Sequence, residues 1–550
     1  MANEHEMRRA GRAGLVAALV MLAVQLIWRT QSSSDGVVQA FPEFIATAIA
    51  KLTPISMFGT ITETYGSNAK KTLLVACCVG VVVVGILAGR LAWRLTASHA
   101  PSFGRRLAAG AGVALLLFLV VTILILPITD LGVFARHSSH TSDILTQLII
   151  TFALFAIVWA MLTGTTAPES DASAPTVDRR SVVTSGAWLV LALASIGGII
   201  AALTSMLRAK PISSEELAQQ EAAANQIIAD QRATETAGTP IASGTPAIGP
   251  EVFAQLEADG KLTPVLTTTV DFYHVSKNFT DPTVSADGWT LSIEGLVDTP
   301  VQFTLEDLNA MATTRMITTL CCISNEINGD LIGTAEWQAV PLVDLLAKAG
   351  VQAGTVDFKL SAADDYHDSF PLAVGQDPNV LVVVGMNGAP LGDDHGYPAR
   401  LIVPPIYGMK NVKWITKIEA VNEDYIGFWQ ERGWSDDAHY QIWGRIDYPT
   451  GKIKAGQDYV CGVASAGDRG INRVEISLDG GDSWLDATLE PPLNGRFTWV
   501  RWAMPFTAQI GEYDIKMRAT DGTGTVMTQK KQPPAPDGAT GWPSRDVKVN

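Results

Sequence analysis

Cysteine is scarce in this chain, with five thiols in 550 residues, and only Cys321, Cys322 and Cys461 lie outside the hydrophobic N-terminal part. Three cysteines exclude a disulfide framework for the rest of the protein. A thiol kept under these conditions is either a small buried hydrophobe or a ligand. Basic residues are also outnumbered, and with a net charge of −15 we expect no nucleic-acid partner.

Long apolar runs, in contrast, dominate the first 208 residues. Five of them approach the roughly 20 residues that cross a bilayer core. The first is the weakest, because Arg12 and Arg29 leave it short. Together with a mean hydropathy of +0.19, these runs predict a membrane anchor joined to an acidic soluble part. The five predicted spans are Gly14–Trp28, Thr72–Leu95, Leu107–Leu126, Ile144–Met161 and Val182–Met206.

The loops between these runs differ in basic residues, which resist translocation and so fix the orientation. One set of loops carries Arg8, Arg9, Arg12, Arg90, Arg94, Arg105, Arg106, Arg179 and Arg180. The opposite set carries only Lys51, Lys70, Lys71 and Arg136. With the N-terminus inside, an odd number of spans predicts that everything after Met206 is extracytoplasmic.

The predicted spans contain no histidine. Membrane anchors that carry electrons often hold haem between histidines on facing helices, so we expect no haem here. His5, His99, His137 and His140 all fall in termini or loops. The spacing of His137 and His140 suits a metal, but without a nearby cysteine a solvated loop is the favoured interpretation.

The remaining sequence predicts a linker and two soluble domains. An Ala/Gln-rich stretch that can form a helix is followed by a Thr/Pro/Gly/Ser stretch, which together favour a stalk over residues 211–262. Residues 263–440 mix an alternating strand at Trp289–Val297 with a helix N-cap at Thr304, so we predict an α+β domain. Residues 441–550 show short strands with a Gly480-Gly481 turn, typical of a β-sandwich.

Three separated segments of the soluble part carry the chemistry. The first is the aromatic run Asp271–Phe279, the second contains the two cysteines, and the third is Asp393–Glu419. In the third segment His395, Arg400, Lys410 and Lys413 gather with glycines in an otherwise acidic chain, which suits a buried phosphate. A thiolate and a phosphate cradle together favour a cofactor that offers both a soft metal and a phosphate, such as molybdenum held by a pterin dithiolene.

The same residues resemble a known family. Cys322-Ile323-Ser324-Asn325 followed by GTAEWQAVPL, together with HGYPARLIVPPIYGMKNVKW, is similar to the sulfite oxidase family of molybdopterin-dependent oxidoreductases. The resemblance runs from about Leu262 to the C-terminus, and the five-span anchor resembles a bacterial membrane-bound subgroup. It implies an immunoglobulin-like dimerisation domain at the C-terminus and hence a homodimer.

The resemblance also implies roles for individual residues. Cys322 matches the thiolate that binds molybdenum, which leaves Cys321 as a packing neighbour. The positions that match the family's binding of the pterin and its phosphate are Phe272, Tyr273, His274, His395, Arg400, Asn411, Val412 and Lys413.

Two departures from the family pattern concern the substrate. Sulfite oxidases carry consecutive arginines after the cysteine segment, whereas this chain has Glu326 and Asp330 there. They also place a tyrosine near the metal where this chain has Val384. If the two acidic residues face the pocket they repel an anion, which argues against sulfite.

The resulting prediction is a multidomain enzyme: an anchor of five transmembrane helices (residues 1–210), a linker (211–262), a molybdopterin-binding α+β domain (263–440) and an all-β immunoglobulin-like domain (441–550). It transfers an oxygen atom to or from a small substrate outside a bacterial inner membrane, and a separate cytochrome or quinone-linked protein exchanges its electrons. Arg179-Arg180 is either an internal twin-arginine export signal or an ordinary pair of positive-inside arginines. The alternative function is a redox-silent, membrane-anchored binding or scaffold protein on the same fold.

Overall fold

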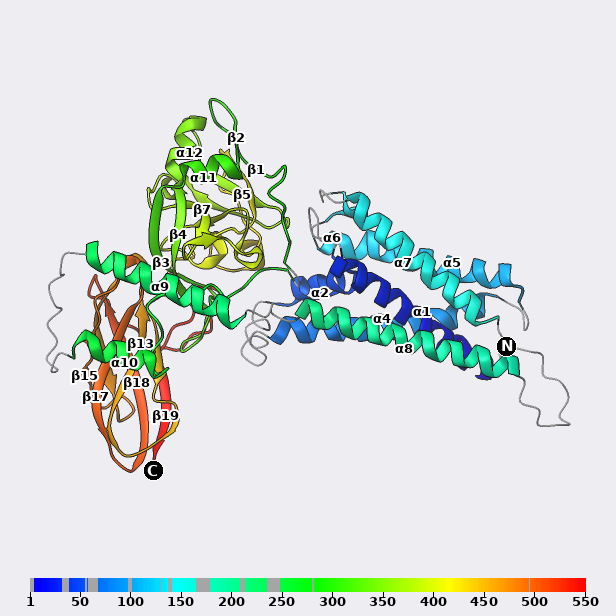
Figure 1. Cartoon of the computed structure of the whole chain (residues 1–550). Helices are drawn as coiled ribbons and strands as arrows, with labels where there is room; N and C mark the ends of the chain where they lie inside the picture. Colours follow the sequence, from blue (N-terminus) through cyan, green and yellow to red (C-terminus); the bar gives the residue numbers. More distant parts are fainter. Residues whose placement is uncertain are drawn as a thin grey trace. The chain divides into compact units, whose positions relative to one another are not determined.

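The structure is a computed structural model that describes residues 4–31, 39–54, 57, 68–96, 101–129, 131–136, 141–164, 179–207, 213–234, 248–278, 281–493 and 495–550. His99, His137 and His140 lie outside the described residues, as do the side chains of Arg179 and Arg180. The chain divides into two compact units, each described below by itself (Figure 1). The first comprises Met1–Lys210 and Asn278–Thr283, and the second comprises Pro211–Lys277 and Val284–Asn550.

The first unit is helical. In its described part five helices are long and apolar enough to cross a membrane, which confirms the predicted number. The first is longer than predicted, covering Glu6–Thr30, because Arg29 is buried beside Glu43 at 3.4 Å rather than ending the helix. The elements in chain order are α1 (Glu4–Gln31), α2 (Phe41–Leu52), α4 (Asn68–Leu95), α5 (Phe103–Val120), η1 (Val121–Ile125), α6 (Leu126–Ile128), η2 (Val133–Ala135), α7 (Thr141–Leu162) and α8 (Arg179–Leu207).

Small residues and buried polar contacts hold these helices together. A Cβ atom on Gly14 of α1 would collide with the carbonyl oxygen of Gly85 in α4, so the two backbones meet directly. The Gln25 side chain donates a hydrogen bond of 2.8 Å to the Thr151 hydroxyl, which ties α1 to α7. Close backbone packing and such internal hydrogen bonds are what a helix bundle in lipid requires.

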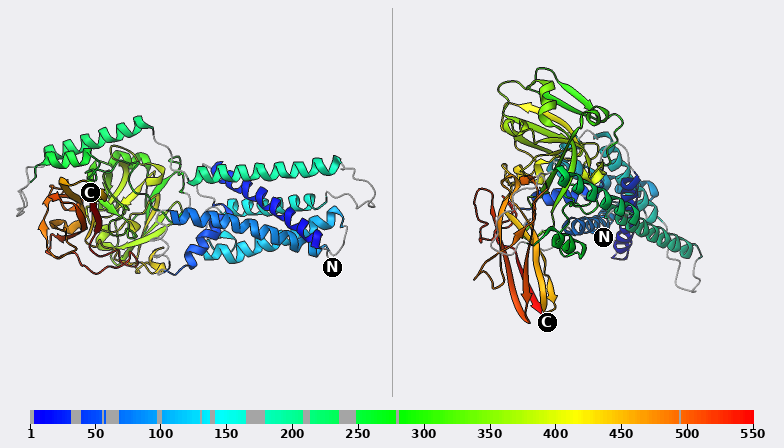
Figure 2. Two further views of the ribbon diagram at one scale, coloured as in Figure 1. Left: turned by 90° about the horizontal axis from the view of Figure 1, so that it is seen from below. Right: turned by 60° about the vertical axis from the view of Figure 1, so that its left-hand side comes forward.

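Two helices open the second unit, α9 (Ser214–Thr234) and α10 (Pro250–Ala258). The Ala/Gln-rich stretch is thus helical as predicted, but it does not stand free as a stalk. Ala224, Ile227 and Ile228 lie on one face of α9, and they pack on Val265 and Ile317 of the same unit. α9 accordingly lies along the outside of this unit (Figure 1, Figure 2).

Two sheets form the middle of the second unit. The first has the strand order β2-β1-β10-β5-β6, and in the second β3, β4, β7 and β8 follow one another while β9 pairs with β7. Thr304 caps α11 as predicted, because its hydroxyl accepts a hydrogen bond from the Asp307 amide. The elements are β1 (Thr290–Gly295), β2 (Val301–Thr304), α11 (Leu305–Met311), β3 (Thr314–Cys321), β4 (Ile332–Pro341), α12 (Leu342–Ala349), β5 (Asp357–Ala362), β6 (His367–Pro371), α13 (Leu372–Gly375), β7 (Leu381–Met386), β8 (Ala389–Pro390), η3 (Asp393–His395), β9 (Arg400–Ile402), η4 (Gly408–Lys410), β10 (Ile415–Val421) and η5 (Gln430–Arg432).

The C-terminal region is rich in β-strands. Its sheets have the orders β11-β13-β17-β16 and β12-β19-β18-β14-β15, and Trp502 of the first shares a buried core with Val474 and Ile476 of the second. The alternation predicted around Val474 and Ile476 therefore places both side chains inward. The elements are β11 (Trp443–Tyr448), β12 (Gly451–Ile453), β13 (Gly456–Ser465), η6 (Gly467–Arg469), β14 (Ile471–Ser477), β15 (Leu485–Asp486), β16 (Thr488–Leu489), η7 (Gly495–Phe497), β17 (Val500–Ala508), β18 (Gly511–Asp521) and β19 (Ser544–Val549).

Candidate active site

The cysteine pair lies where β3 ends and a tight loop begins. The Cys322 amide donates to the carbonyl oxygen of Leu331 at 3.0 Å, and the Asn325 amide donates to the Cys322 carbonyl at 3.0 Å. The Asn325 side chain closes the loop further, because its Oδ1 accepts from the Leu331 amide at 3.0 Å. Both backbone polar groups of Cys322 are therefore fixed within the loop.

The two thiols differ in their surroundings. Cys321 Sγ accepts a hydrogen bond from Asn325 Nδ2 at 3.5 Å, and burial raises the pKa of this thiol far above its ordinary value. Cys321 therefore stays a neutral thiol in the core. Cys322 Sγ lies 3.0 Å from the Ser324 hydroxyl, at the start of the loop. Cys321 is therefore a packing thiol, whereas Cys322 lies on the side of the other candidate residues.

The aromatic segment meets the cysteine loop through a glycine. Phe272 stacks on Tyr273 with ring centroids 5.3 Å apart. A Cβ atom on Gly408 would lie 2.8 Å from the Tyr273 hydroxyl oxygen and 3.8 Å from Cys322 Cα. Because Gly408 has no side chain, the third segment can pass between Tyr273 and Cys322. His274, in contrast, has an exposed side chain.

Arg400 is a buried cation at the same site. Its guanidinium donates only to backbone carbonyls, those of His395 (3.2 Å), Leu401 (3.4 Å) and Asn411 (3.3 Å). It lies 5.3 Å from the Trp337 ring centroid, and burial lowers its pKa to about 10. Within the described ranges no carboxylate lies at ion-pair distance from Arg400. A buried charge without a counter-charge is costly, so this position favours an anionic ligand.

His395 and Gly396 shape the turn before Arg400. Gly396 has a φ of +106°, and a Cβ atom there would lie 3.0 Å from Lys413 Cβ and 3.1 Å from Arg400 Cβ. The left-handed glycine therefore brings the two cations close together. His395 Nε2 carries a proton and donates to the Thr269 carbonyl at 2.9 Å, while burial lowers the histidine pKa to about 4. His395 is thus a neutral donor at physiological pH.

Other residues of the third segment have internal partners. Asn411 Oδ1 accepts from the Val403 amide, and Nδ2 donates to the carbonyls of Ile406 and Tyr407. The Val412 carbonyl accepts from the Leu401 amide. These two residues therefore hold the segment in place by their own hydrogen bonds.

Lys410 and Lys413 differ from the expectation of a joint phosphate cradle. Lys413 is half-buried, and its ammonium donates to the Asp394 carbonyl at 2.8 Å beside the Arg400 turn. Lys410 is buried between Asp368 and Asp436, at 3.3 and 2.8 Å. Two carboxylates already neutralise Lys410, so only Arg400 and Lys413 are placed to meet an anion.

Tyr366, Tyr407 and Tyr440 complete the site, and the sequence did not single them out. The Tyr440 hydroxyl accepts from the Cys321 amide at 3.0 Å, and its ring packs on that of Tyr407 with centroids 4.8 Å apart. Burial raises the pKa of Tyr366 and Tyr273 well above the ordinary value, and the nearby Cys322 adds to both shifts. Tyr366 and Tyr440 come from distant segments, so no local spacing could reveal them.

The donor set fits a molybdenum-pterin group. In the described part of the chain no three histidine, cysteine or acidic side chains gather as metal ligands. A metal held by Cys322 therefore needs further donors from a cofactor, and a pterin dithiolene supplies soft sulfur ligands and a phosphate. The uncompensated Arg400 suits that phosphate.

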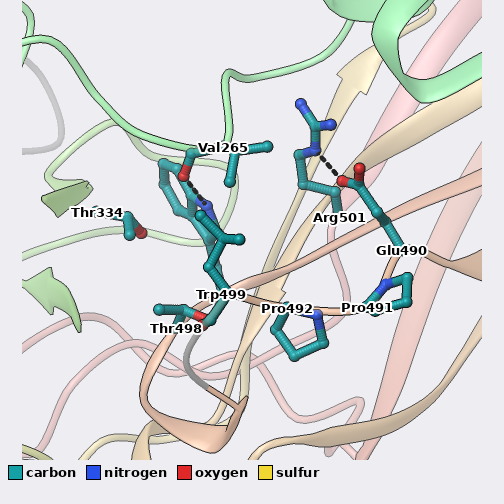
Figure 3. Close-up of a pocket in the computed structure, with 9 residues that line it drawn as sticks. Val265, Thr334, Glu490, Pro491, Pro492, Thr498, Trp499 and Arg501 are labelled. Carbon is teal, nitrogen blue, oxygen red and sulfur yellow. Dashed lines mark hydrogen bonds and ion pairs between the residues drawn. The ribbon is translucent and has the colours of Figure 1, made fainter. Parts of the chain in front are cut away.

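A small pocket elsewhere in the second unit is not this site. It has a volume of about 10 Å³ and lies beside Val265, Thr334 and Trp499 (Figure 3). Arg501 and Glu490 form an ion pair at its rim. No cysteine lines it, and its volume holds about one water molecule.

Comparison with known proteins agrees with the site. Residues 278–429 match the family model of the oxidoreductase molybdopterin binding domain, and residues 450–533 match that of the Mo-co oxidoreductase dimerisation domain. Residues 278–533 therefore carry the pair of domains of a molybdopterin-dependent oxidoreductase of the sulfite oxidase type. Both matches lie within the stretch on which the sequence resemblance depends, so the cofactor prediction is confirmed at the level of the family.

Individual relatives match less than half of this chain. Mitochondrial sulfite oxidase of Macaca fascicularis is 29% identical over 303 residues, covering 46% of this chain and 55% of the relative. Nitrate reductase [NADH] of Hordeum vulgare is 25% identical over 308 residues, covering 44% of this chain and 34% of the relative. The chain thus spans about half or less of these relatives. The sulfane dehydrogenase SoxCD structure from Paracoccus pantotrophus aligns with a TM-score of 0.45 and 23% identity, covering 58% of this chain and 96% of that one.

Proposed function

We propose that this protein is a membrane-anchored molybdenum-cofactor oxidoreductase that transfers an oxygen atom to or from a small substrate. The observation that carries the proposal is that one loop thiol, Cys322, and a buried cation, Arg400, both act electrostatically on Tyr273, while Arg400 has no carboxylate partner within the described ranges. A redox-silent binding protein has no need of a thiol and an unpaired buried charge around the same tyrosine.

Each candidate residue has a role set by its contacts. Cys322 holds the metal, Arg400 and Lys413 hold the phosphate, and His395 offers a neutral donor beside them. Phe272 and Tyr273 present ring faces to the pterin. The cofactor, when bound, supplies the two-electron chemistry of oxygen transfer.

Other members of the candidate set act indirectly. Asn411 and Val412 fix the backbone that carries these groups, because their polar atoms bond within the segment. The exposed His274 lies at the solvent side of the aromatic segment.

The substrate differs from that of the curated relatives in charge. Glu326 and Asp330 are exposed on the cysteine loop, and Val384 is a buried apolar residue in β7. A loop with two carboxylates disfavours a doubly charged oxyanion such as sulfite, so we propose an uncharged oxide or its reduced form.

The anchor and domain organisation belong to the same proposal. Residues 1–210 form the membrane anchor, and the basic loops orient it so that residues 263–440 and 441–550 are extracytoplasmic. The C-terminal β-rich region is an immunoglobulin-like domain that pairs two subunits. Electrons pass to or from a separate cytochrome or quinone-linked protein, since no haem is expected in the anchor.

Metal analysis of the purified full chain, expressed in a host that makes the cofactor, tests the proposal. We expect close to one molybdenum per chain, and less than a tenth would refute it. Cys322→Ser removes the metal's redox signal, whereas the matched control Cys321→Ser keeps it. A screen of sulfoxides, N-oxides, sulfite and nitrate with viologen or ferricyanide as mediator then gives direction and substrate class together.

A further inference from the structure

The buried Lys410 is part of a chain of charged side chains that reaches solvent. Its ammonium contacts Asp436 Oδ1 at 2.8 Å, Asp368 Oδ1 at 3.3 Å and the Ser369 carbonyl at 2.8 Å. The side chains of Lys410 and Asp368 are 2% and 0% exposed, whereas that of Asp436 is 47% exposed. The chain therefore runs from a half-exposed carboxylate to a fully buried one.

The inner end of this chain reaches the active site through Tyr366. The Tyr366 hydroxyl lies 2.7 Å from Asp368 Oδ2 and 2.8 Å from the Met409 carbonyl, and its single hydrogen can serve only one of these acceptors at a time. Met409 follows Gly408, where an added Cβ atom would lie 2.8 Å from the Tyr273 hydroxyl oxygen and 3.8 Å from Cys322 Cα. The hydroxyl thus stands between the charged chain and the thiol loop.

The charge of the cluster suits proton storage. One ammonium and two carboxylates carry a net charge of −1, and the costly part is the negative charge of the fully buried Asp368, since Asp436 is half-exposed. Burial raises the pKa of Asp368, and Lys410 partly opposes that rise. If Lys410 only linked η4 to β6, one carboxylate would be enough to neutralise its charge.

The surroundings of Asp368 are limited to few titratable groups. Lys410 faces it from η4, Tyr366 from the turn before β6, and Tyr425 from the segment after β10. Asp436 and Asp357 add negative charge around Lys410. Beyond Tyr366 lies a separate pair in which Lys277 is 4.0 Å from Asp364. That pair is neutral overall, so the excess negative charge belongs to the Lys410 cluster.

We propose that Asp436, Lys410, Asp368 and Tyr366 form a proton relay between solvent and the Tyr366 hydroxyl beside Cys322. The inference rests on the proposed function, in which removal of an oxygen atom as water consumes two electrons and two protons, and the reverse reaction releases them. The electrons come from the redox partner and the relay supplies the protons. Asp436 takes a proton from water and gives one to Lys410, and Lys410 gives one to Asp368. Asp368 then gives a proton to the Tyr366 oxygen as the Tyr366 hydroxyl releases its own proton towards the active site.

Proton uptake by the molybdenum-loaded full chain in detergent tests the relay without a substrate. Reduced methyl viologen reduces the metal in a stopped-flow mixer while a pH indicator reports proton uptake. Asp436→Asn and Tyr366→Phe are expected to slow uptake at least tenfold. A small weak acid such as acetic acid restores the rate in Asp436→Asn, whose position is half-exposed, but not in Tyr366→Phe.

A matched control and a thermodynamic readout separate the relay from a structural role. Glu475→Gln changes a buried carboxylate of the C-terminal region, paired with Arg518 at 2.8 Å, and should keep the wild-type rate. Asp368→Asn should lose at least half of the pH dependence of the metal's midpoint potential, whereas Tyr366→Phe keeps it. Unchanged uptake in Asp436→Asn, or equal slowing in Glu475→Gln, would overturn the relay.

Failure of the proposed function is distinguishable from failure of the relay. Absence of molybdenum from the wild type refutes the former, and infrared titration of the metal-free chain still tests the latter. A protonated carboxyl band should persist above the ordinary aspartate range, vanish in Asp368→Asn and persist to higher pH in Lys410→Met. No effect of either substitution on that band would refute proton storage at Asp368.

Discussion

The Asn328 side chain donates a hydrogen bond of 3.0 Å to the carbonyl oxygen of Ser544. Its Oδ1 accepts from the Ile446 amide at 3.1 Å, so one residue of the cysteine loop is bonded to two strands of the C-terminal region. The neighbouring carbonyls of Glu326 and Gly329 accept from the side chains of Trp443 and Arg445. The loop that carries Cys322 is therefore fixed from outside as well as from within.

Asn328 also has a left-handed backbone, with a φ of +64°. Asn328→Ala removes two hydrogen bonds and strains the backbone, so we expect a loss of about 3 kcal/mol in the free energy of unfolding. Asn328→Gly removes the same bonds without that strain and should cost about 1 kcal/mol less. Denaturant unfolding followed by tryptophan fluorescence measures both. Equal losses would show that the backbone conformation contributes nothing.

Gly408 separates Tyr273 from the cysteine loop. A Cβ atom 2.8 Å from the Tyr273 hydroxyl is too close, so Gly408→Ala should lower the molybdenum content several-fold. Removal of the hydroxyl in Tyr273→Phe opens the space, and the double variant Gly408→Ala/Tyr273→Phe should regain most of the metal. Metal analysis of the four proteins completes a double-mutant cycle. Independent, additive losses would contradict the proposed contact.

His395 makes the stability of the second unit dependent on pH. Its pKa is about 4 in the folded chain, below the unfolded value of about 6.5, so the unfolded chain binds more protons between these two values. The free energy of unfolding should therefore fall as the pH is lowered from about 6.5 to 4, by at most about 3 kcal/mol. In His395→Gln this part of the slope disappears. Thermal unfolding at several pH values provides the measurement, and an unchanged slope in the variant would exclude His395 as the cause.

Arg400 and Arg501 are buried arginines with opposite surroundings. Arg501 pairs with Glu490 and Glu257, so Arg501→Met leaves the buried Glu490 with only the half-exposed Arg232 and should cost about 3 kcal/mol. Arg400→Met removes a charge that has no carboxylate partner within the described ranges, so the metal-free chain should be as stable as the wild type or more so. Its molybdenum content should nevertheless fall. Strong destabilisation of the metal-free Arg400→Met chain would mean that an internal anion neutralises the arginine.

The sequence predicted the parts of this molecule that depend on local pattern. Hydropathy located the five apolar helices, and alternation located the strands around Val474 and Ile476. The packing of α9 was missed, because its face of Ala224, Ile227 and Ile228 is short within a polar helix. A partner for such a face depends on the tertiary fold and leaves no local signal.

The candidate site shows the same division. The sequence motifs located the segments that contain Cys322 and Arg400, but the charge pattern grouped Lys410 with the phosphate ligands. The carboxylates that bind Lys410 come from β6 and from the segment after β10, about 40 and 26 positions away in the chain. Charge spacing along one segment does not reveal such partners.

All five cysteines are buried, and none forms a disulfide. A maleimide added to intact cells therefore finds almost no reactive background on this protein. Ile510 is 80% exposed in the second unit. Labelling of an Ile510→Cys variant would therefore report, with little background, on which side of the membrane that unit lies. Single-site labelling of this chain therefore does not require that its native cysteines be replaced first.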